Sequence, residues 1–445
     1  MNSLITQIVE RLGITSLNEM QEVSLKAFQS NDDIVLLSPT GSGKTLAYLL
    51  PLICQINTEN SDLQIIILVP SRELAIQIDS VIKSTKTAVR SMCCYGGRPA
   101  MEEHRSLRSV CPHILVATPG RMNDHLSKEN VNAFKVRQLV IDEFDKCLEF
   151  GFQDEMNQVI SKLPGLYRRI LISATDAPEI PSFVREGSSS KQAIKRLDFL
   201  KTNNVPGQIT QYLVHSPEND KLETLYRMLC FIKGKPAIVF VNYRDSVERV
   251  GTFLKEKGFY CECFHGGMEQ EMRERALNKF RNGSSNVLVS TDLSARGLDI
   301  PEIEAIIHYH LPINDEAYIH RTGRTGRWDA TGNSYLILNP KEEIPSYAEK
   351  GFENLILPET VDAPIAPKWV TLYIGKGKKD KLNKIDIVGF LCKKGGLTSK
   401  DLGIIEIRDH YAYAAINRNK IKLLMNNIRG EKIKGIRTLF ELMKK

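Results

Sequence analysis

The chain has 445 residues, 42% of them hydrophobic and 25% charged, which is enough for about three globular domains and argues against a disordered chain. Its net charge of +7 is uneven, because residues 369–445 carry 18 basic and 7 acidic side chains, a net +11, which leaves −4 on the remainder. No apolar run approaches the ~20 residues of a membrane-spanning helix, no secretory leader is visible, and the nine cysteines lack zinc-like or disulfide-scaffold spacing, so we expect a cytoplasmic protein with free thiols.

Short β-branched and apolar runs alternate with helical patterns along the first two-thirds of the chain. This alternation predicts parallel strands that are covered by helices on both faces. The first series of strands is expected at residues 33–38, 63–70, 113–118, 138–142 and 169–173, and the second at residues 236–241, 260–265, 286–291, 305–310 and 333–338. Two series predict two α/β domains, with a surface loop at residues 187–192 and an interdomain linker at residues 201–207.

A proline-punctuated stretch at residues 356–368 precedes the basic C-terminal segment. Here we expect strands at residues 370–374, 403–408, 411–416 and 434–440, and helices at residues 384–393 and 420–425, which together make a small α+β domain. The predicted domains are therefore residues 1–200, 208–345 and 369–445. The charge of the last domain favours a polyanionic partner, although charge alone is equally compatible with a basic domain that has no partner.

The segment Ser38–Thr45 reads SPTGSGKT and lies between an expected strand and an expected helix. Its glycines allow backbone N–H groups to close around phosphates, and the helix N-terminus adds a favourable dipole. Lys44 is placed to reach the β- and γ-phosphates of a nucleotide, and the Thr45 hydroxyl to bind Mg²⁺. The pattern predicts a nucleoside triphosphate site, although Ser38 stands where the usual pattern has its first glycine. We assign phosphate binding to Thr40, Gly41, Ser42, Gly43, Lys44 and Thr45.

The apolar strand at residues 139–141 ends in two carboxylates, Asp142 and Glu143. By alternation these side chains lie on opposite sides of the strand end. We expect Asp142 to bind Mg²⁺ and Glu143 to orient or deprotonate an attacking water. Strands often end in acids, so it is the position of this pair about 100 residues after the phosphate loop that makes the prediction strong.

The segment His320–Arg327 reads HRTGRTGR and places three arginines at a spacing of three. A solvated basic surface is the usual interpretation of such a run, but each glycine would destabilise a surface helix by about 1 kcal/mol. Arginines of the second α/β domain that stabilise the charge on a γ-phosphate, as arginine fingers do, explain the pattern better.

Residues 4–340, which carry these motifs in order, resemble a DEAD-box ATP-dependent RNA helicase. The DEAD box reads DEFD at residues 142–145, and the motif after the next strand reads SAT at residues 173–175. The resemblance implies two tandem RecA-like domains, ATP and Mg²⁺ as cofactors, and RNA as the partner. The remaining matches are Gly13 with Gln21 of the Q motif, residues 70–75, residues 96–97, residues 118–121, residues 240–242, Gln270 with Arg273, residues 291–299 and the arginine run.

The resemblance also implies roles for single residues. Gln21 would read the adenine, Asp299 would touch the ribose, and Arg324 and Arg327 would be the arginine fingers. Coupling between the domains would involve Ser173, Thr175, His320 and Arg321. The RNA backbone would follow a path lined by Arg72, Gly97, Thr118, Arg121, Gln270, Arg273 and Thr291.

The sequence departs from the family pattern in the DEAD box and around the Q motif. Phe144 replaces the alanine of the DEAD box, and alternation predicts that it packs into the protein rather than beside Asp145. Leu4 stands where the family has an aromatic residue that stacks on adenine, and Ile14 replaces the aromatic after Gly13. We therefore expect retained activity, with ATP affinity weakened at the adenine end.

Residues 369–445 resemble the RRM-type RNA-binding domain at the C-terminus of DbpA-like helicases, through residues 370–375, 395–398, 402–405 and 433–435. Tyr411 and Tyr413 share one sheet face by alternation, where aromatic rings either stack on bases or merely cover the sheet. Asp409 stands where this fold prefers a basic residue, which favours RNA binding through residues 376–384 and the loop of Lys393 and Lys394.

The sequence thus predicts an ATP-dependent RNA helicase, most simply a monomer, that remodels structured RNA. The resemblance of its C-terminal domain implies ribosomal RNA during ribosome assembly. One rival is a DNA-directed helicase of the same design, against which Gln21 and the DEAD-type motifs argue. The other is a non-catalytic RNA clamp, against which the complete phosphate, acidic and arginine motifs argue.

Overall fold

In the computed structural model of the protein, residues 3–39, 41–97, 100–175, 194–200, 209–292, 303–325, 331–348 and 351–443 are described. They form two compact units, one that covers the described residues up to Leu200 and one from Ile209 onward. The predicted loop at residues 187–192 and linker at residues 201–207 lie outside the described residues. Within the described ranges, the helices are all too short or too polar to cross a membrane.

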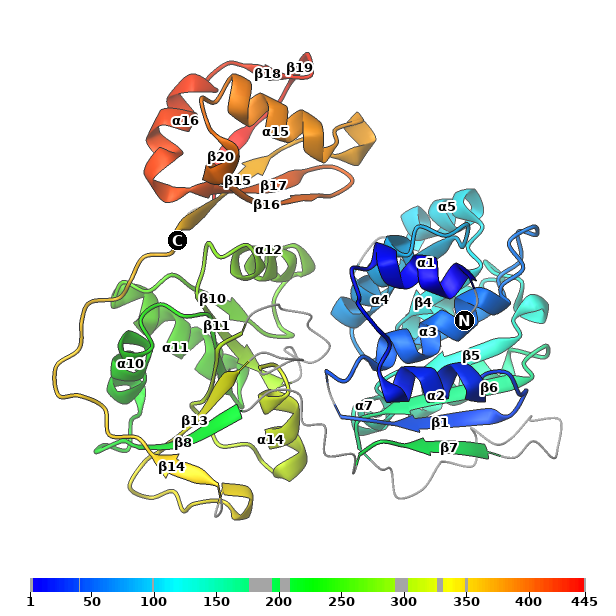
Figure 1. The fold of residues 1–445 in the computed structure, drawn as a ribbon, viewed down its shortest axis with the longest axis horizontal. Coiled ribbons are helices and arrows are strands. Elements are labelled where there is room, and N and C mark those ends of the chain that lie inside the picture. The colour runs from blue at the N-terminus through cyan, green and yellow to red at the C-terminus, as the bar shows by residue number, and fades with distance from the viewer. Residues whose placement is uncertain are drawn as a thin grey trace. The chain divides into compact units, whose positions relative to one another are not determined.

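The first unit is built on a seven-stranded parallel sheet with the order β3-β4-β2-β5-β6-β1-β7 (Figure 1). Neighbouring residues of a strand enter different cores: Ile34 and Leu36 face one layer of helices, and Val35 and Leu37 face the other. Burial on both faces explains why these strands are continuous apolar runs. The strands are β1 (Asp33–Leu37), β2 (Ile65–Leu68), β3 (Ser91–Cys94), β4 (Ile114–Ala117), β5 (Gln138–Ile141), β6 (Arg168–Ser173) and β7 (Ile194–Asp198).

Helices cover the two faces of this sheet in two layers. One layer packs into the core of Ile34, and its helices are α1 (Ser3–Arg11), α2 (Glu19–Ala27), α3 (Lys44–Gln55) and α4 (Arg72–Ser84). The other packs into the core of Val35, and its helices are α5 (Ala100–Val110), α6 (Pro119–Ser127), α7 (Phe144–Glu149) and α8 (Gln153–Ser161).

The second unit begins with another seven-stranded parallel sheet, with the order β10-β11-β9-β12-β13-β8-β14. Its main core packs this sheet against α10 (Leu222–Phe231) and α11 (Arg244–Glu256), while α12 (Gln270–Arg281) contacts β10 and α14 (Asp315–Thr322) packs on the other face. The strands are β8 (Ile209–His215), β9 (Ala237–Val241), β10 (Cys261–Phe264), β11 (Val287–Thr291), β12 (Ala305–His308), β13 (Gly332–Leu338) and β14 (Phe352–Asn354).

The C-terminal domain is an antiparallel four-stranded sheet with the order β16-β17-β15-β20 and helices packed on one face (Figure 1). This confirms the predicted small α+β domain, whose elements follow one another in the order strand, helix, strand, strand, helix, strand, with the first strand in the middle of the sheet. Its elements are β15 (Trp369–Ile374), α15 (Lys384–Lys393), β16 (Leu402–Ile407), β17 (Ala412–Asn417), α16 (Ile421–Asn427) and β20 (Phe440–Leu442), with a separate hairpin of β18 (Lys432–Ile433) and β19 (Ile436–Arg437).

All ten strands predicted for the two parallel sheets are present. The predicted strand at residues 434–440 was wrong. Lys434 and Gly435 both have left-handed backbone, with φ of 50° and 78°, so they form the turn of the β18–β19 hairpin, and the edge strand begins only at Phe440. Strands β3, β7, β8 and β14 were not predicted, because they are short or carry polar residues on an exposed face.

Candidate functional site

The phosphate loop joins β1 to α3 at the carboxyl edge of the first sheet. Gly41 and Gly43 have φ of 82° and 87°, a left-handed backbone that favours glycine, and α3 begins at Lys44. The Nζ of Lys44 donates to the Ser38 carbonyl at 2.6 Å and to the Pro39 carbonyl at 3.3 Å. Ser38 stands in place of the first glycine, and its hydroxyl donates to the Ser42 hydroxyl at 2.7 Å, a hydrogen bond within the loop.

The Q motif packs directly on this loop. Asn18 caps α2, its Oδ1 accepts from the Gln21 N–H at 2.9 Å, and the Oε1 of Gln21 accepts from the Asn18 N–H at 3.0 Å. The Nε2 of Gln21 then donates to the Gly43 carbonyl at 3.3 Å, and Asn18 Nδ2 donates to the Ser42 carbonyl at 2.9 Å. The capping box therefore fixes the predicted adenine reader, which is only 1% exposed, against the phosphate loop.

The two acidic residues follow β5, at the same edge of the sheet. Asp142 is buried; its Oδ2 accepts the Tyr48 hydroxyl at 2.9 Å and its Oδ1 accepts the Glu143 N–H at 2.9 Å. Burial, and then the Glu143 carboxylate, raise the pKa of Asp142 to about 6, while the Tyr48 hydrogen bond and Lys44 act to lower it. Tyr48 lies one helical turn after Lys44, so α3 presents both to Asp142.

Glu143 has a backbone and a carboxylate that fit a site for a cation and a reacting water. Its φ and ψ of 49° and 50° are left-handed, which is uncommon for a residue with a Cβ and clusters at functional sites. Its Oε2 is buried and has no hydrogen-bond partner among the described residues. Carboxylate and hydroxyl oxygens are the ligands Mg²⁺ prefers, so Asp142 and Thr45 fit that ion beside a nucleotide.

The acidic segment is connected to the end of β6. Thr175 donates its hydroxyl to Asp145 Oδ2 at 3.0 Å, while Ser173 donates its hydroxyl to the Thr175 carbonyl at 2.6 Å. Phe144 is 2% exposed and belongs to the core on the α5–α8 face, as its position between Glu143 and Asp145 predicted. The segments around Asp142 and Ser173 are thus physically linked.

The residues predicted to contact the RNA backbone in the first unit follow three neighbouring strands, β2, β3 and β4. The Arg72 guanidinium lies over the Gly96–Gly97 turn, where a Cβ added to Gly97 would be 2.6 Å from Arg72 Nη1. Thr118 is the N-cap residue of α6, and Arg121 Nε donates to the Tyr95 carbonyl at 3.3 Å. Arg121 also pairs with the buried Glu103 at 3.3 Å, which fixes its side chain.

Arg321 joins three motifs of the second unit. It is 1% exposed, its Nη2 donates to Asp292 Oδ2 and to Asn242 Oδ1, each at 2.7 Å, and its Nη1 donates to the His310 carbonyl at 2.6 Å. These partners follow β11, β9 and β12, so one buried guanidinium ties together the carboxyl ends of three neighbouring strands. A charged hydrogen-bonded hub of this kind is costly to break.

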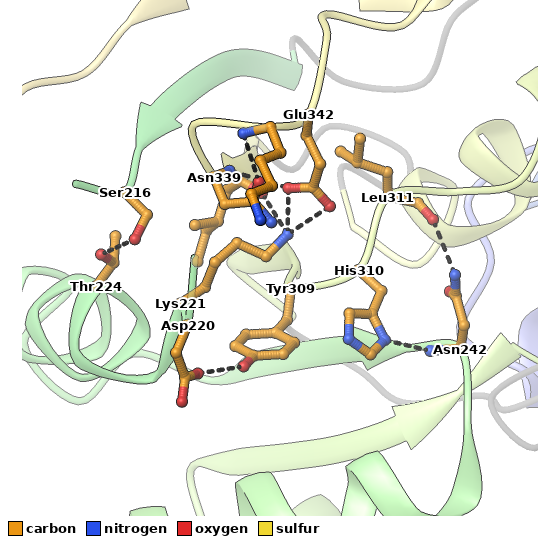
Figure 2. A network of polar contacts seen from close by, with 12 residues as sticks. Ser216, Asp220, Lys221, Thr224, Asn242, Tyr309, His310, Leu311, Asn339 and Glu342 are labelled. Atoms are coloured by element: carbon orange, nitrogen blue, oxygen red, sulfur yellow. Dashed lines mark hydrogen bonds and ion pairs between the residues drawn. The ribbon is translucent and has the colours of Figure 1, made fainter. Parts of the chain in front are cut away.

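A polar network that includes Lys221 also contains His310 and Asn242, two of the residues that Arg321 contacts (Figure 2). The buried Lys221 ammonium pairs with both oxygens of Glu342, at 3.0 and 2.8 Å, and donates to the Ile337 carbonyl at 2.9 Å. Beside it, His310 Nδ1 accepts the Asn242 N–H at 3.1 Å, and Asn242 Nδ2 donates to the Leu311 carbonyl at 3.2 Å. Burial, and then Lys221, lower the pKa of His310 to about 4, so it is neutral at pH 7 and keeps this acceptor.

The remaining predicted residues of the second unit are mostly buried. Arg324 is 4% exposed and its Nε donates to the His320 carbonyl at 3.4 Å. On α12, Gln270 donates to Glu274 at 3.1 Å, and the Arg273 guanidinium lies 5.1 Å above the Phe264 ring. Thr291 ends β11, next to Asp292. Thr40, Asp299 and Arg327 lie outside the described residues.

In the C-terminal domain the predicted lysines and tyrosines lie in different environments. Lys393 and Lys394 are exposed at the end of α15, where Lys394 pairs with Glu431 at 3.4 Å. Tyr411 is partly buried and Tyr413 only 4% exposed, and their rings lie 5.2 Å apart. Asp409 is exposed in the turn before β17, outside the strands of the sheet.

Several supporting residues were missed by the sequence analysis. Tyr48 had a usable signal, since it stands four residues after Lys44 on the same helix face. Asn18 also had one, because an Asn three residues before a Gln at a helix start predicts a capping box. Lys221 and Glu342 had none: they are 121 residues apart and meet only in the folded second unit.

Comparison with known proteins finds family matches in three regions of the chain. Residues 18–182 match the DEAD/DEAH box helicase family, residues 220–329 the helicase conserved C-terminal domain, and residues 371–441 the DbpA RNA binding domain. The ATP-dependent RNA helicases DbpA of Bacillus subtilis and Escherichia coli are 30% and 31% identical to this chain; the matches cover 97% and 98% of it, and 95% and 96% of the relatives.

Solved structures agree. Saccharomyces cerevisiae Dbp5 bound to RNA and ADP BeF3 is 26% identical with a TM-score of 0.68, covering 77% of this chain and 88% of its own. Mss116p bound to ssRNA and AMP-PNP is 26% identical with a TM-score of 0.69, covering 76% and 73%. The chain therefore belongs to the DEAD-box family of ATP-dependent RNA helicases, and it carries a DbpA RNA binding domain at its C-terminal end.

Proposed function

We propose that this helicase remodels structured ribosomal RNA during ribosome assembly, with its basic C-terminal domain anchoring the RNA. The RNA target rests on the resemblance of that domain to those of DbpA-like helicases, and the anchoring on its net charge of +11. The catalytic part rests on one observation: Lys44, Asp142 and Glu143, from two distant segments, meet at one edge of the first sheet.

At that edge we propose that the phosphate loop binds ATP, with Lys44 on the β- and γ-phosphates. Thr45 and Asp142 would hold Mg²⁺, which would neutralise phosphate charge when bound. Glu143, whose Oε2 is not used by the described protein, would orient the attacking water and take its proton. Arg324, with Arg327, would stabilise the γ-phosphate charge in the transition state, and Gln21 and Asp299 would bind the nucleoside.

Replacing Lys44 by Ala or Glu143 by Gln tests this assignment. Each change removes one preorganised group, so we expect kcat for RNA-stimulated ATP hydrolysis to fall about 10²–10³-fold. Glu143→Gln should retain ATP binding, because the amide keeps the size of the carboxylate. The matched control is Glu129→Gln, an exposed glutamate of the same unit with left-handed backbone, which should leave kcat unchanged. Near wild-type turnover in either active-site variant would contradict the assignment.

The proposed anchoring is carried by the exposed lysines of the C-terminal domain. Lys393 and Lys394 are exposed at the end of α15, and Gly396 is exposed beside them. Each phosphate contact makes the affinity fall with salt at a log–log slope of roughly −0.7 for single strands. Structured RNA should therefore bind the full chain with a steep salt dependence.

The double replacement Lys393→Ala with Lys394→Ala tests the loop against charge in general. We expect weaker binding of a ribosomal RNA hairpin and a salt slope that is shallower by about 1.4, the loss of two contacts. The control, Lys420→Ala with Lys422→Ala, removes the same charge from exposed positions of the same domain. Equal effects of the two pairs would show that only net charge matters and would refute a specific site at the loop.

Location and assembly are also proposals. All nine cysteines are free thiols, which supports a reducing cytoplasm. We propose a monomer, and sedimentation of the full chain with and without RNA would test that. A duplex panel with RNA and DNA loading strands tests the preference for RNA over DNA.

A further inference from the structure

Tyr48 places its hydroxyl against the carboxylate that we assign to Mg²⁺. The ring of Tyr48 is fully buried in the core that α3 forms with the first sheet, so packing fixes its position. The hydroxyl donates to Asp142 Oδ2 at 2.9 Å. A tyrosine hydroxyl keeps its proton at pH 7, so this contact is a hydrogen bond from a neutral donor to a carboxylate, which is among the stronger kinds.

Asp142 is held at its backbone and at both oxygens of its carboxylate. Its N–H donates to the Leu68 carbonyl at 2.9 Å, which continues the pairing of β5 with β2. Its Oδ1 accepts the Glu143 N–H at 2.9 Å, and its Oδ2 accepts the Tyr48 hydroxyl. The terminal torsion of an aspartate has broad minima, so sterics alone do not set the plane of the carboxylate. Two donors, one on each oxygen, do set it.

The same carboxylate keeps acceptor positions for a cation. A carboxylate offers about four such positions, and the Tyr48 hydroxyl and the Glu143 N–H use one on each oxygen. The others are available to Mg²⁺ or to a water that Mg²⁺ binds. This ion requires a near-octahedral arrangement of ligands and keeps several of its waters. The direction in which the free positions of Asp142 point therefore matters as much as its charge.

The hydroxyl of Tyr48 has two opposing effects on a cation at Asp142. As a donor it draws electron density from the carboxylate, which weakens the attraction of the carboxylate for a positive charge. As a group fixed by packing it keeps the carboxylate in one orientation, so little ordering is needed when the ion binds. Hydrogen-bond partners behind metal ligands are typically worth 10–100-fold in metal affinity, which indicates that the orienting effect is the larger one.

We propose that Tyr48 is a positioning residue, which orients Asp142 and thereby sets the affinity of the nucleotide site for Mg²⁺. It acts through Asp142 and not on the phosphates, because its side chain is buried and its hydroxyl faces that carboxylate. This deepens the proposed function and rests on it for the assignment of Asp142 to Mg²⁺. The alternative is a purely structural role, in which the ring fills the core and the hydroxyl has no effect on the ion.

Tyr48→Phe tests the proposal, because it removes the hydroxyl and keeps the ring. The affinity of the full chain for the fluorescent nucleotide mant-AMP-PNP is measured in Mg²⁺ and again in EDTA, and the ratio of the two values is the gain in affinity that the ion provides. We expect this gain to fall about tenfold in Tyr48→Phe, with the affinity in EDTA unchanged. Because the nucleotide is not hydrolysed, the measurement does not depend on turnover.

Two control variants accompany this measurement. Tyr167→Phe removes a hydroxyl from a partly buried tyrosine that precedes β6, at the opposite edge of the first sheet, and should bind the nucleotide like wild type in both conditions. Asp142→Asn removes the charge that we assign to Mg²⁺ and should abolish the gain. The first control measures the effect of losing a tyrosine hydroxyl elsewhere in the unit, and the second measures the whole contribution of the carboxylate.

The outcomes separate the role of Tyr48 from the function on which it rests. If Asp142→Asn loses the gain from Mg²⁺ while Tyr48→Phe keeps it, the cation site stands and the positioning role is wrong. A larger gain in Tyr48→Phe would show that the electronic effect of the donor prevails, and an affinity in EDTA that falls as much as that in Mg²⁺ would show a general effect on the fold; either result overturns the proposal. If Asp142→Asn keeps the wild-type gain, the Mg²⁺ assignment of the proposed function itself fails.

Discussion

In the proposed ATP site, the backbone conformation of Glu143 and the contacts of its neighbours depend on one another. Glu143 is held in left-handed backbone, a conformation that costs of order 1–3 kcal/mol and persists where the surroundings enforce it. The enforcing contacts are its own N–H on Asp142 and the burial of Phe144 beside it. Tyr48 completes the arrangement, because its hydroxyl fixes the other oxygen of Asp142.

At the residue scale, His310 predicts how stability depends on pH. Its folded-state pKa of about 4 is below the ordinary 6.5, so the unfolded chain binds the extra proton between these values. The neutral ring therefore contributes stability that is complete above pH 6.5 and is lost as the pH falls towards 4. Because the ring is partly exposed, we expect about 1–3 kcal/mol between pH 7 and 4, measured by chemical unfolding.

The matched variant is His310→Asn, whose Oδ1 can still accept the Asn242 N–H but does not titrate. Between pH 7 and 4 the free energy of unfolding of this variant should fall by about 1–3 kcal/mol less than that of wild type. Some loss of stability in acid should remain, because the pKa of the buried His308 is also lowered well below 6.5. Identical stability-versus-pH curves for the two proteins would contradict the role assigned to His310.

At the element scale, α7 shows how Phe144, in place of the family's alanine in the DEAD box, changes the packing of the core. The family pattern has alanine where Phe144 begins this helix, and here the ring fills the core between α7 and the sheet. Phe144→Ala restores the family residue but should leave a cavity and destabilise the first unit by about 3–5 kcal/mol. Thermal unfolding measures this change; ATP turnover at low temperature should persist.

Phe134→Ala is the control for this prediction, because Phe134 is 72% exposed in the same unit. Its change in unfolding free energy should stay within about 0.5 kcal/mol. An equally small effect of Phe144→Ala would show that the core relaxes around the missing ring and that the substitution is neutral for packing.

At the scale of the whole molecule, sheet order separates the two ligands of the first unit. The strands that precede the predicted RNA-contact residues are β3, β4 and β2, and those that precede the predicted ATP and coupling residues are β5, β6 and β1, so the two sets lie on different halves of the carboxyl edge. Ligands of open parallel sheets bind at this edge. We therefore propose that the two ligands bind at separate halves of the same sheet edge.

The arginine run lies in the second unit and the phosphate loop in the first, so we expect the rate of ATP hydrolysis to depend on RNA binding. ATP hydrolysis should be slow without nucleic acid, rise with RNA and respond little to DNA of the same sequence. Arg324→Ala should lower the RNA-stimulated kcat by about 10³-fold or more, as expected for an arginine finger. The control Arg437→Ala changes an exposed arginine of the C-terminal domain and should leave kcat unchanged. Equal stimulation by DNA, or full turnover of Arg324→Ala, would contradict this prediction.

Local features of this protein were readable from the amino-acid order alone. The apolar runs predicted ten strands and two parallel sheets, because alternation and burial on both faces act on residues that are neighbours in the chain. The phosphate loop, the Asp142–Glu143 pair and the arginine run were likewise visible as short segments. A two-residue turn was the exception: Lys434 and Gly435 looked like part of a strand, since nothing in composition marks a lysine with left-handed backbone.

Contacts between distant segments were decided only by the tertiary structure. Tyr48 and Asp142 are 94 residues apart, Arg321 and Asn242 are 79 apart, and Lys221 and Glu342 are 121 apart. Whether Tyr413 is exposed or buried likewise has no signature in its own strand, where alternation gives the face but not what covers it. The physical reason is that strand order and helix packing bring such groups together, and neither is encoded within a single segment.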